Sequence, residues 1–168
     1  MAMDSNKVLT KKPSRKWPRI ALVATVFLAV FVLFHTVLYL SFIPSESMEP
    51  TLHTYSFVVF KPIATDPKPG DIVLIWSGEL KKNLVKRVIG IGGDTLTFTD
   101  QGVFRNNELV TESYTQGKTT SETQTFTVPA HCVFLMGDNR EHSFDSRFWQ
   151  NPYLQISGIK GVLLFKLL

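Results

Sequence analysis

The sequence predicts an all-β domain of antiparallel sheets preceded by one N-terminal transmembrane helix. Residues 20–40 form a run of 21 amino acids without Asp, Glu, Lys or Arg. At helical rise such a run spans roughly 30 Å, the thickness of a bilayer core. From residue 43 onward, short runs rich in β-branched and aromatic residues alternate with Gly, Pro and Asn turn residues, as in a sandwich or barrel. We therefore expect a basic tail at 1–19, a membrane anchor at 20–40 and a β-rich domain at 41–168.

The charge of the first 19 residues sets the expected orientation of the anchor. This tail holds six Lys or Arg and one Asp, whereas the whole chain has a net charge of +4. Basic flanks stay in the cytoplasm, so we expect a single-pass protein of the cytoplasmic (inner) membrane with an extracytoplasmic β-rich domain. A cleavable signal peptide is the alternative, but its apolar region normally has only ~7–15 residues. Because the excess of positive charge is confined to the tail, the sequence indicates no nucleic acid as a partner.

Short strands are expected along the rest of the chain, each bounded by turn residues. Residues 102–110 form a predicted hairpin, since Asn106 and Asn107 tolerate the positive φ of a two-residue turn. We expect a tight turn at 90–93, which is rich in Gly, and a mobile surface loop at 111–124, which is rich in Thr, Ser and Gln. The other predicted strands cover residues 55–60, 72–76, 84–89, 95–99, 125–129, 131–136 and 156–168.

A serine near the end of the anchor is the first candidate for chemistry. Ser47 follows the apolar run by seven residues and lies between Pro44 and Pro50. Prolines restrict the backbone, so the segment is expected to be extended rather than helical. By itself such a loop is more often a plain turn than a catalytic site.

A lysine inside an apolar strand supplies a candidate base. Lys86 and Arg87 are adjacent in the predicted strand 84–89, so their side chains point to opposite faces and at least one faces the core side. A desolvated lysine has a lowered pKa, and a neutral amine can take a proton from a serine hydroxyl. The alternative is an outward-facing lysine on a half-buried strand. The charged stretch 137–147 looks, in isolation, like a surface loop.

Three of the four histidines are the alternative bases. His35 lies in the predicted anchor, and His53, His131 and His142 leave a Ser–His arrangement as a rival. No HExxH or CxxC spacing occurs, so we expect no metal site and no cofactor. Cys132 is the only cysteine, which excludes an intrachain disulfide, and its apolar surroundings predict a small buried residue.

Four segments in order resemble the sequence boxes of one protease family. They are Ser45–Leu52, Gly70–Val73, Lys86–Asp94 and Gly137–Arg147. Each alone is weak evidence, but together and at these approximate spacings they resemble bacterial type I signal peptidases, membrane-bound serine proteases that remove signal peptides. The resemblance runs from the apolar stretch to Arg147 and implies an all-β catalytic core built around two antiparallel sheets.

The resemblance also implies a role for each matching residue. Ser47 would be the nucleophile and Lys86 the general base. The Ser45 hydroxyl would join the Ser47 backbone N–H in the oxyanion hole, and Ser143 would orient the Lys86 amine. Ion-paired residues would hold the loops around the site, namely Arg87, Asp138, Asp145 and Arg147.

We expect the substrate pocket to be walled by apolar residues that flank the serine and the lysine. The candidates are Ile43, Met48, Leu52 and Val85. The expected partners are preproteins that carry a signal peptide, the lipid bilayer and the protein-secretion machinery. Small residues before the cut would fit shallow apolar pockets.

Two alternatives to a general signal peptidase stay open. One is a specialised relative that matures a pilin or a conjugation protein, by hydrolysis or by acyl-transfer cyclisation. The other is an anchored β domain that only binds partners, against which the presence of both Ser47 and Lys86 argues. The chain has one apparent anchor and a short segment between Asp94 and Gly137, as in a compact form of the family.

Overall fold

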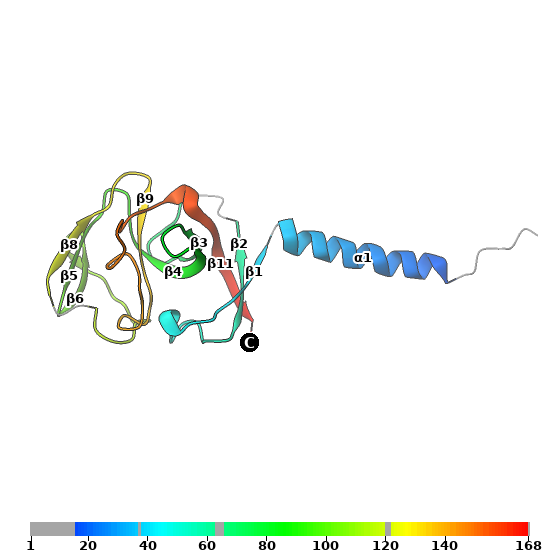
Figure 1. Ribbon diagram of the computed structural model, residues 1–168, viewed down its shortest axis with the longest axis horizontal. Helices are drawn as coiled ribbons and strands as arrows, with labels where there is room; N and C mark the ends of the chain where they lie inside the picture. Colours follow the sequence, from blue (N-terminus) through cyan, green and yellow to red (C-terminus); the bar gives the residue numbers. More distant parts are fainter. Residues whose placement is uncertain (1–15, 37, 63–65, 120–121, 168) are drawn as a thin grey trace, which may run out of the picture.

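The protein consists of an N-terminal helix followed by a β domain (Figure 1). The computed structural model describes residues 16–36, 38–62, 66–119 and 122–167, with the side chains of 33–36 left out. Helix α1 covers Trp17–Thr36 and projects away from the β domain. The tail predicted at 1–19 lies mostly outside the described residues.

The larger of the two sheets carries the strands nearest to α1. In the described part of the chain its order is β1-β2-β11-β3-β4-β9-β10, and all neighbours are antiparallel. The strand bounds are β1 Tyr39–Phe42, β2 Phe57–Lys61, β3 Ile72–Ser77, β4 Lys82–Ile91, β9 Cys132–Met136, β10 Leu154–Gln155 and β11 Ile159–Leu167. Most follow the predicted runs, because each combines β-branched residues with a turn on either side.

The smaller sheet forms the end of the domain farthest from α1 (Figure 1). Its order is β7-β6-β5-β8, with β5 at Thr95–Thr99, β6 at Gly102–Arg105, β7 at Glu108–Leu109 and β8 at Gln124–Thr127. The predicted hairpin is confirmed: Asn106 and Asn107 have φ of 54° and 69° between β6 and β7. Two antiparallel sheets confirm the predicted fold class of the domain.

The helix is shorter than the apolar run predicted. It ends at Thr36, and Tyr39 and Leu40 instead pair with Phe60 and Val59 of β2. Apolar and aromatic side chains occur in strands as well as in membrane helices, so the run could not locate this boundary. Within the described residues, no helix has both the length and the apolarity needed to cross a membrane.

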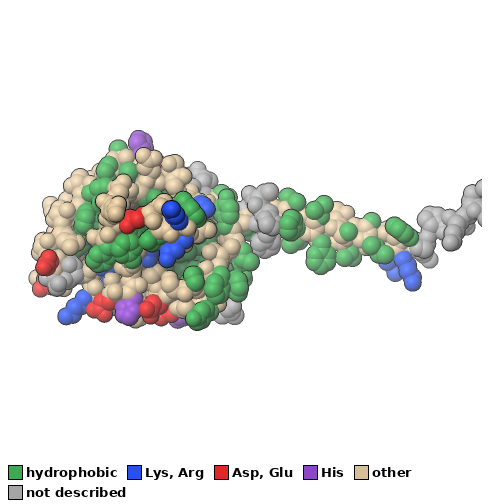
Figure 2. All heavy atoms as spheres, viewed as in Figure 1, with side chains coloured by type: hydrophobic (Ala, Val, Ile, Leu, Met, Phe, Trp, Pro, Cys, Tyr) green, Lys and Arg blue, Asp and Glu red, His purple; other side chains and the backbone are tan. Residues whose placement is uncertain are grey.

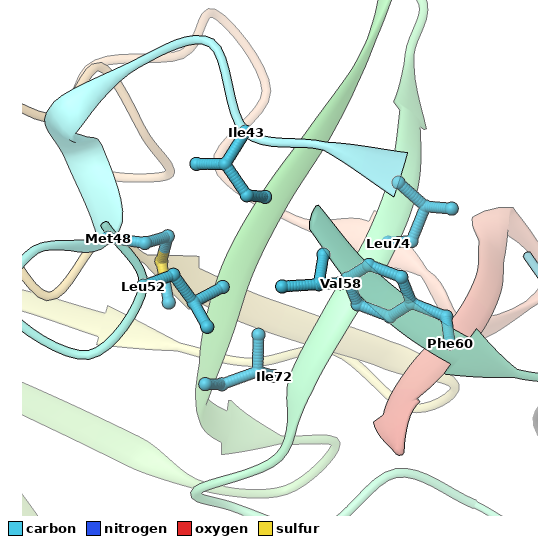
Figure 3. Close-up of a cluster of buried hydrophobic side chains, with 7 residues drawn as sticks. All are labelled: Ile43, Met48, Leu52, Val58, Phe60, Ile72 and Leu74. Carbon is cyan, nitrogen blue, oxygen red and sulfur yellow. The ribbon is translucent and has the colours of Figure 1, made fainter. Parts of the chain in front are cut away.

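A compact apolar cluster lies under the segment that carries Ser47 (Figure 3). Met48 and Leu52 come from that segment and are only 1% exposed. They pack on side chains from the larger sheet, namely Val58, Phe60, Ile72 and Leu74. Burying one side chain of this size stabilises the folded state by roughly 1.5–3 kcal/mol. The segment that carries Ser47 is therefore held in place by its own apolar residues.

Three further predictions are wrong in detail. Residues Glu46–Met48 form a 3₁₀ turn, η1, instead of an extended segment, because neither proline lies inside the turn. Cys132 is only partly buried, since it begins β9 at the edge of its cluster. Residues 111–119 pack on the rest of the domain through Gln116, which bridges to Asn139, so this part is not a free loop.

Candidate active site

Lys86 ends in a buried chain of hydrogen bonds. Its Nζ donates to Ser143 Oγ at 2.9 Å, and Ser143 Oγ donates to Asp145 Oδ2 at 2.6 Å. Lys86 is 3% exposed and Asp145 is fully buried. The sequence placed Lys86 on a strand and Ser143 on a distant loop, and the structure brings the two side chains together.

Burial makes Lys86 an unusually acidic lysine. Desolvation is the largest effect and lowers the pKa of Lys86 to about 8, against an ordinary value of 10.5. Asp145 and Asp138 oppose this by favouring the charged amine, whereas Arg147 and Lys82 add to it. The neutral amine is therefore populated near neutral pH, as a general base requires.

Ser47 lies on η1, which contacts the loop Gly137–Arg147 that carries Ser143. Its carbonyl oxygen accepts from the Asn139 backbone N–H at 3.1 Å. A Cβ at Gly137 would overlap both this carbonyl and the Ser143 hydroxyl, so glycine at 137 lets the two segments approach closely. Among the described residues, no hydrogen bond joins Ser47 Oγ to Lys86 Nζ. In enzymes without substrate, hydrogen bonds between catalytic groups are often incomplete and form fully only when substrate binds.

The side chains of Ser47 and Lys86 both line one cavity of about 410 Å³. Ser45, Ser47 and Lys86 line it, and Ser45 is exposed. Of the four predicted pocket residues, Ile43, Met48 and Val85 line the cavity. Leu52 does not, because it packs inward in the cluster of Figure 3. The rest of the lining is Ser41, Phe42, Pro44, Leu74, Leu80, Lys82, Asn83, Leu84, His142 and Phe144.

Two buried ion pairs hold the walls of the cavity. Arg87 makes a two-pronged contact with Asp138, at 2.8 Å from Nε and 2.6 Å from Nη2. Arg147 contacts Asp145 Oδ1 at 2.8 Å through Nε. The four residues expected to be paired near the site are thus paired with one another, and forked contacts of this kind fix orientation as well as charge.

Of the three histidines considered as alternative bases, His142 lines the cavity. Its Nδ1 lies 2.7 Å from Glu46 Oε1, and this hydrogen bond, with the charge of Glu46, raises the pKa of His142. The pair is half exposed and joins the residue before Ser47 to the residue before Ser143. His53 and His131 do not line the cavity. In the described part of the chain, no three His, Cys, Asp or Glu side chains could together hold a metal ion.

Comparison with known proteins now decides the family. The family described as "Signal peptidase, peptidase S26" matches residues 15–168 of the chain. The chain belongs to the signal peptidase family. Its relatives include the signal peptidase I of Bacillus licheniformis, which is 33% identical over 159 residues that cover 86% of this chain and 84% of the relative.

Other members of the signal peptidase family are longer than this chain. It covers 59% of the signal peptidase I of Leptolyngbya laminosa at 34% identity, and 55% of that of Pseudomonas aeruginosa at 30% identity. These matches span 64% and 66% of this chain. The crystal structure of a signal peptidase I from Enterococcus faecalis V583 matches with a TM-score of 0.51 and 24% identity, over 60% of this chain and 98% of that one. This last likeness concerns the fold.

Sequence reasoning missed several residues around this signal peptidase site. His142 and Phe144 line the cavity, and Glu112 and Tyr114 contact the buried arginines behind it. Glu112 and Tyr114 lie in the stretch interpreted as a loop, where no pattern marks a buried carboxylate. An acidic and an aromatic residue in an otherwise Thr- and Gln-rich stretch were the only available hint.

Replacing Lys86 with Met is expected to stabilise the folded protein near neutral pH. The folded pKa of Lys86 is about 8, below the ordinary 10.5, so holding the charged amine costs the folded state about 3 kcal/mol below pH 8. Between pH 8 and pH 10.5 the unfolded chain still carries a proton on Lys86 that the folded chain has lost. The stabilisation gained by Lys86→Met therefore shrinks as the pH rises through this range. Ser143 keeps its acceptor, Asp145, in the variant.

Urea unfolding at pH 7 and pH 10 measures this difference. Lys61→Met is the matched control, because Lys61 is exposed at the end of β2 and is not among the charges that shift the pKa of Lys86, so it should give no pH-dependent gain. A Lys86→Met protein no more stable than the wild type at pH 7 would contradict the assigned burial cost.

Proposed function

We propose that the protein is a serine endopeptidase that removes N-terminal signal peptides from exported preproteins, with Ser47 as nucleophile and Lys86 as general base. The observation that carries this proposal is the buried Lys86 amine, held by Ser143 at 2.9 Å in the cavity that also contains Ser47. Membership of the signal peptidase family supports the reaction type, and the names of its relatives support the substrate class.

The proposed reaction is acyl transfer through a serine ester. Neutral Lys86 takes the proton of Ser47 Oγ while that oxygen attacks the scissile carbonyl carbon. The Ser47 backbone N–H and the Ser45 hydroxyl donate to the resulting oxyanion, and one such donor typically contributes about 2.7–4 kcal/mol. The Lys86 ammonium then gives its proton to the leaving amine, and the signal peptide stays on Ser47 as an ester.

Water completes the cycle. Lys86, neutral again, takes a proton from a water molecule that attacks the ester carbonyl. The second tetrahedral intermediate collapses, Ser47 regains its proton from Lys86, and the signal peptide leaves with a free carboxylate. Ser143 keeps the Nζ lone pair aimed into the cavity by accepting one of the amine's hydrogens.

The preprotein is proposed to bind as an added strand. Strand β9 pairs with β4 only from Arg87 to Ile91, so the first half of β4, Lys82–Lys86, offers main-chain groups beside the cavity. An extended peptide can pair with such an edge. The apolar walls at Ile43, Leu84 and Val85 favour small apolar side chains before the cut, and one extra methylene changes binding by only ~1–3 kcal/mol.

Attachment to a bilayer is a further part of the proposal. The described side chains of α1 from Trp17 to Val32 are exposed and mostly apolar. Exposed aromatic residues continue this surface on the adjoining end of the β domain, where Phe42 packs on Tyr55 and Phe57. Figure 2 shows hydrophobic side chains on both parts. A basic tail before α1 supports a cytoplasmic N-terminus and an extracytoplasmic site, within reach of secreted preproteins.

Substitution of either catalytic residue is expected to abolish cleavage. Ser47→Ala and Lys86→Ala should each lower kcat for a signal-bearing preprotein by at least roughly 1,000-fold, because the two groups act as one unit. Ser157→Ala and Lys61→Ala are matched controls at exposed positions outside the cavity. Cleavage is followed by mass spectrometry of both products.

The products also separate hydrolysis from its alternatives. A signal peptide with a free carboxylate supports the proposed peptidase, whereas a joined product with the mass of one water less supports cyclisation. Substantial turnover by Ser47→Ala or Lys86→Ala, with controls intact, would sink the Ser–Lys assignment.

The pH profile should report the lysine. Because the neutral amine is the active form and burial lowers the pKa of Lys86 to about 8, kcat/KM should rise with pH through about 8 and fall roughly ten-fold per unit below it. His142→Gln should keep this limb near 8. A profile that is flat down to pH 5, or a limb that disappears in His142→Gln, contradicts a lysine base.

Charges placed on α1 should weaken membrane attachment. The full chain is expected to float with liposomes and to resist a carbonate wash. Val23→Lys combined with Phe27→Lys should release a large share of it, since a charged side chain is unfavourable where the exposed apolar face of α1 contacts lipid. Phe148→Lys, an exposed position on the β domain, is the control. Wild-type protein that stays in the aqueous fraction would contradict attachment.

A further inference from the structure

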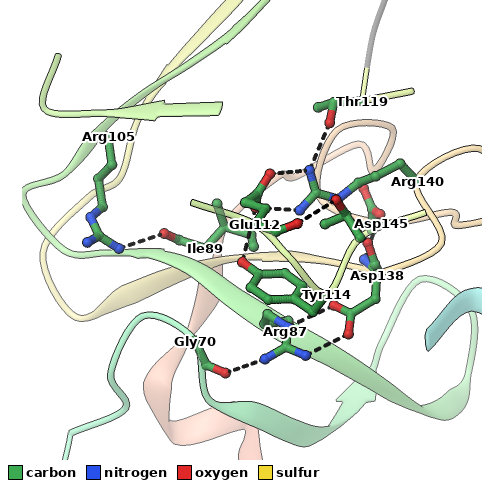
Figure 4. A network of polar contacts seen from close by, with 12 residues as sticks. Gly70, Arg87, Ile89, Arg105, Glu112, Tyr114, Thr119, Asp138, Arg140 and Asp145 are labelled. Carbon is green, nitrogen blue, oxygen red and sulfur yellow. Dashed lines mark hydrogen bonds and ion pairs between the residues drawn. The ribbon is translucent and has the colours of Figure 1, made fainter. Parts of the chain in front are cut away.

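The segment 111–119, here called the strap, shares buried contacts with the loop Gly137–Arg147 (Figure 4). Glu112 makes a forked contact with Arg140, at 2.8 Å to Nη1 and 2.5 Å to Nη2. The Arg140 side chain is fully buried, and that of Glu112 is 9% exposed. A buried arginine that lost this carboxylate would be left with an uncompensated charge, which is strongly unfavourable.

The main chain of the strap is also joined to the loop. The Gln116 N–H donates to the Asp138 carbonyl at 2.9 Å, and the Arg140 N–H donates to the Gln116 carbonyl at 2.7 Å. Thr119 accepts from both arginines of the loop: its hydroxyl from Arg140 at 2.8 Å and its carbonyl from Arg147 at 2.6 Å. The strap thus holds the loop at several successive points.

A continuous path of hydrogen bonds leads from Arg140 to the catalytic amine. Arg140 Nε donates to the Gly137 carbonyl at 3.1 Å, and the Gly137 N–H donates to Asp145 Oδ2 at 3.0 Å. The same Oδ2 accepts from Ser143, whose hydroxyl accepts from Lys86. Every group on this path is buried. Because packed interiors transmit displacements, a movement of Arg140 is expected to move Ser143 as well.

A second contact reaches the residue next to Lys86. The Tyr114 ring stacks on the Arg87 guanidinium, 3.8 Å from its carbon to the ring centre, and the Tyr114 hydroxyl donates to Glu112 at 3.1 Å. Burial is the main reason that the pKa of Tyr114 is raised, so this hydroxyl keeps its proton. Glu112 therefore contacts Arg140 directly and Arg87 through Tyr114.

We propose that Glu112 is a positioning residue for the peptidase reaction: through Arg140 and the loop Gly137–Arg147 it holds the Ser143 hydroxyl against Lys86 Nζ. This proposal rests on the proposed function of Ser47 and Lys86. The strap lies outside the four segments that resemble the family boxes, so the role belongs to residues that those segments do not include.

Loosening the loop should change the lysine in a measurable direction. The groups that face Lys86 are Ser143 and the charges of Asp145, Asp138, Arg147 and Lys82, with desolvation as the largest effect. If Ser143 moves away, water reaches the amine and desolvation weakens. The pKa of Lys86 then moves up from about 8 toward 10.5, and less of the neutral base is present at pH 7.

Glu112→Gln in the full chain tests this role. It keeps the side-chain shape but removes the charge that Arg140 needs. We expect kcat for preprotein cleavage to fall roughly ten-fold with KM little changed, because the defect is in alignment and not in binding. The midpoint of the acid limb of kcat/KM should move upward. Glu112→Asp, which restores the carboxylate, should recover a midpoint near that of the wild type.

Two further variants keep the test decisive. Glu108→Gln changes an exposed glutamate on neighbouring β7 and should behave as wild type. Tyr114→Phe removes only the hydrogen bond to Glu112 and keeps the ring over Arg87, so it decides the question if Glu112→Gln does not fold. A merely structural role would lower the amount of folded enzyme without moving the pH midpoint, and that result overturns the proposal. Wild-type behaviour of Glu112→Gln together with Tyr114→Phe also overturns it.

Titration of Lys86 by NMR separates this proposal from the proposed function. Isotope-labelled lysine reports the Lys86 pKa in the folded protein whether or not a preprotein is cleaved. An upward shift in Glu112→Gln supports the coupling even if the wild type shows no turnover, which would instead count against the peptidase assignment. An unchanged Lys86 pKa overturns the coupling while leaving the peptidase assignment intact.

Discussion

The architecture of the site depends on one buried carboxylate, Asp145. Its Oδ2 accepts from the Ser143 hydroxyl and the Gly137 N–H, and its Oδ1 accepts from Arg147. Ser143 holds the lysine, Gly137 lies against the Ser47 carbonyl, and Arg147 reaches the strap. A buried carboxylate without these donors would be costly, so the positions of lysine, serine segment and strap are set together.

The distribution of the buried charges explains why the pKa of Lys86 is lowered. Each buried arginine has its own carboxylate: Asp138 for Arg87, Glu112 for Arg140 and Asp145 for Arg147. Lys86 shares Asp145 with Arg147, whose charge opposes a second cation nearby. Desolvation is therefore only partly offset for Lys86, and its pKa falls to about 8. The three ion-paired arginines fix the groups around Lys86, which favours an amine held at one angle to the cavity.

Local patterns predicted much of the fold, but contacts between distant segments were beyond them. The strand at 95–99 and the turn at Asn106–Asn107 matched, because period-two alternation and turn residues act over a few positions. The end of α1 did not, since pairing of Tyr39 with β2 decides it. In the site, the sequence boxes indicated Lys86 and Ser143, whereas Leu52 proved to be a core residue and Glu112 was missed. Both outcomes depend on what lies across the fold.

Curvature of the larger sheet brings the serine and the lysine to one cavity. The order β1-β2-β11-β3-β4 separates the strand before Ser47 from the strand of Lys86 by three others, yet η1 contacts β4. Register shifts in β11 and at Val88/Gly90 of β4 supply bends of the kind that bulges produce. At Gly161 a Cβ would lie 2.7 Å from the Lys61 carbonyl, so glycine permits the close approach of β11 and β2. A Ser–Lys pair assembled in this way exists only in the folded sheet, and no short stretch of the chain could carry it alone.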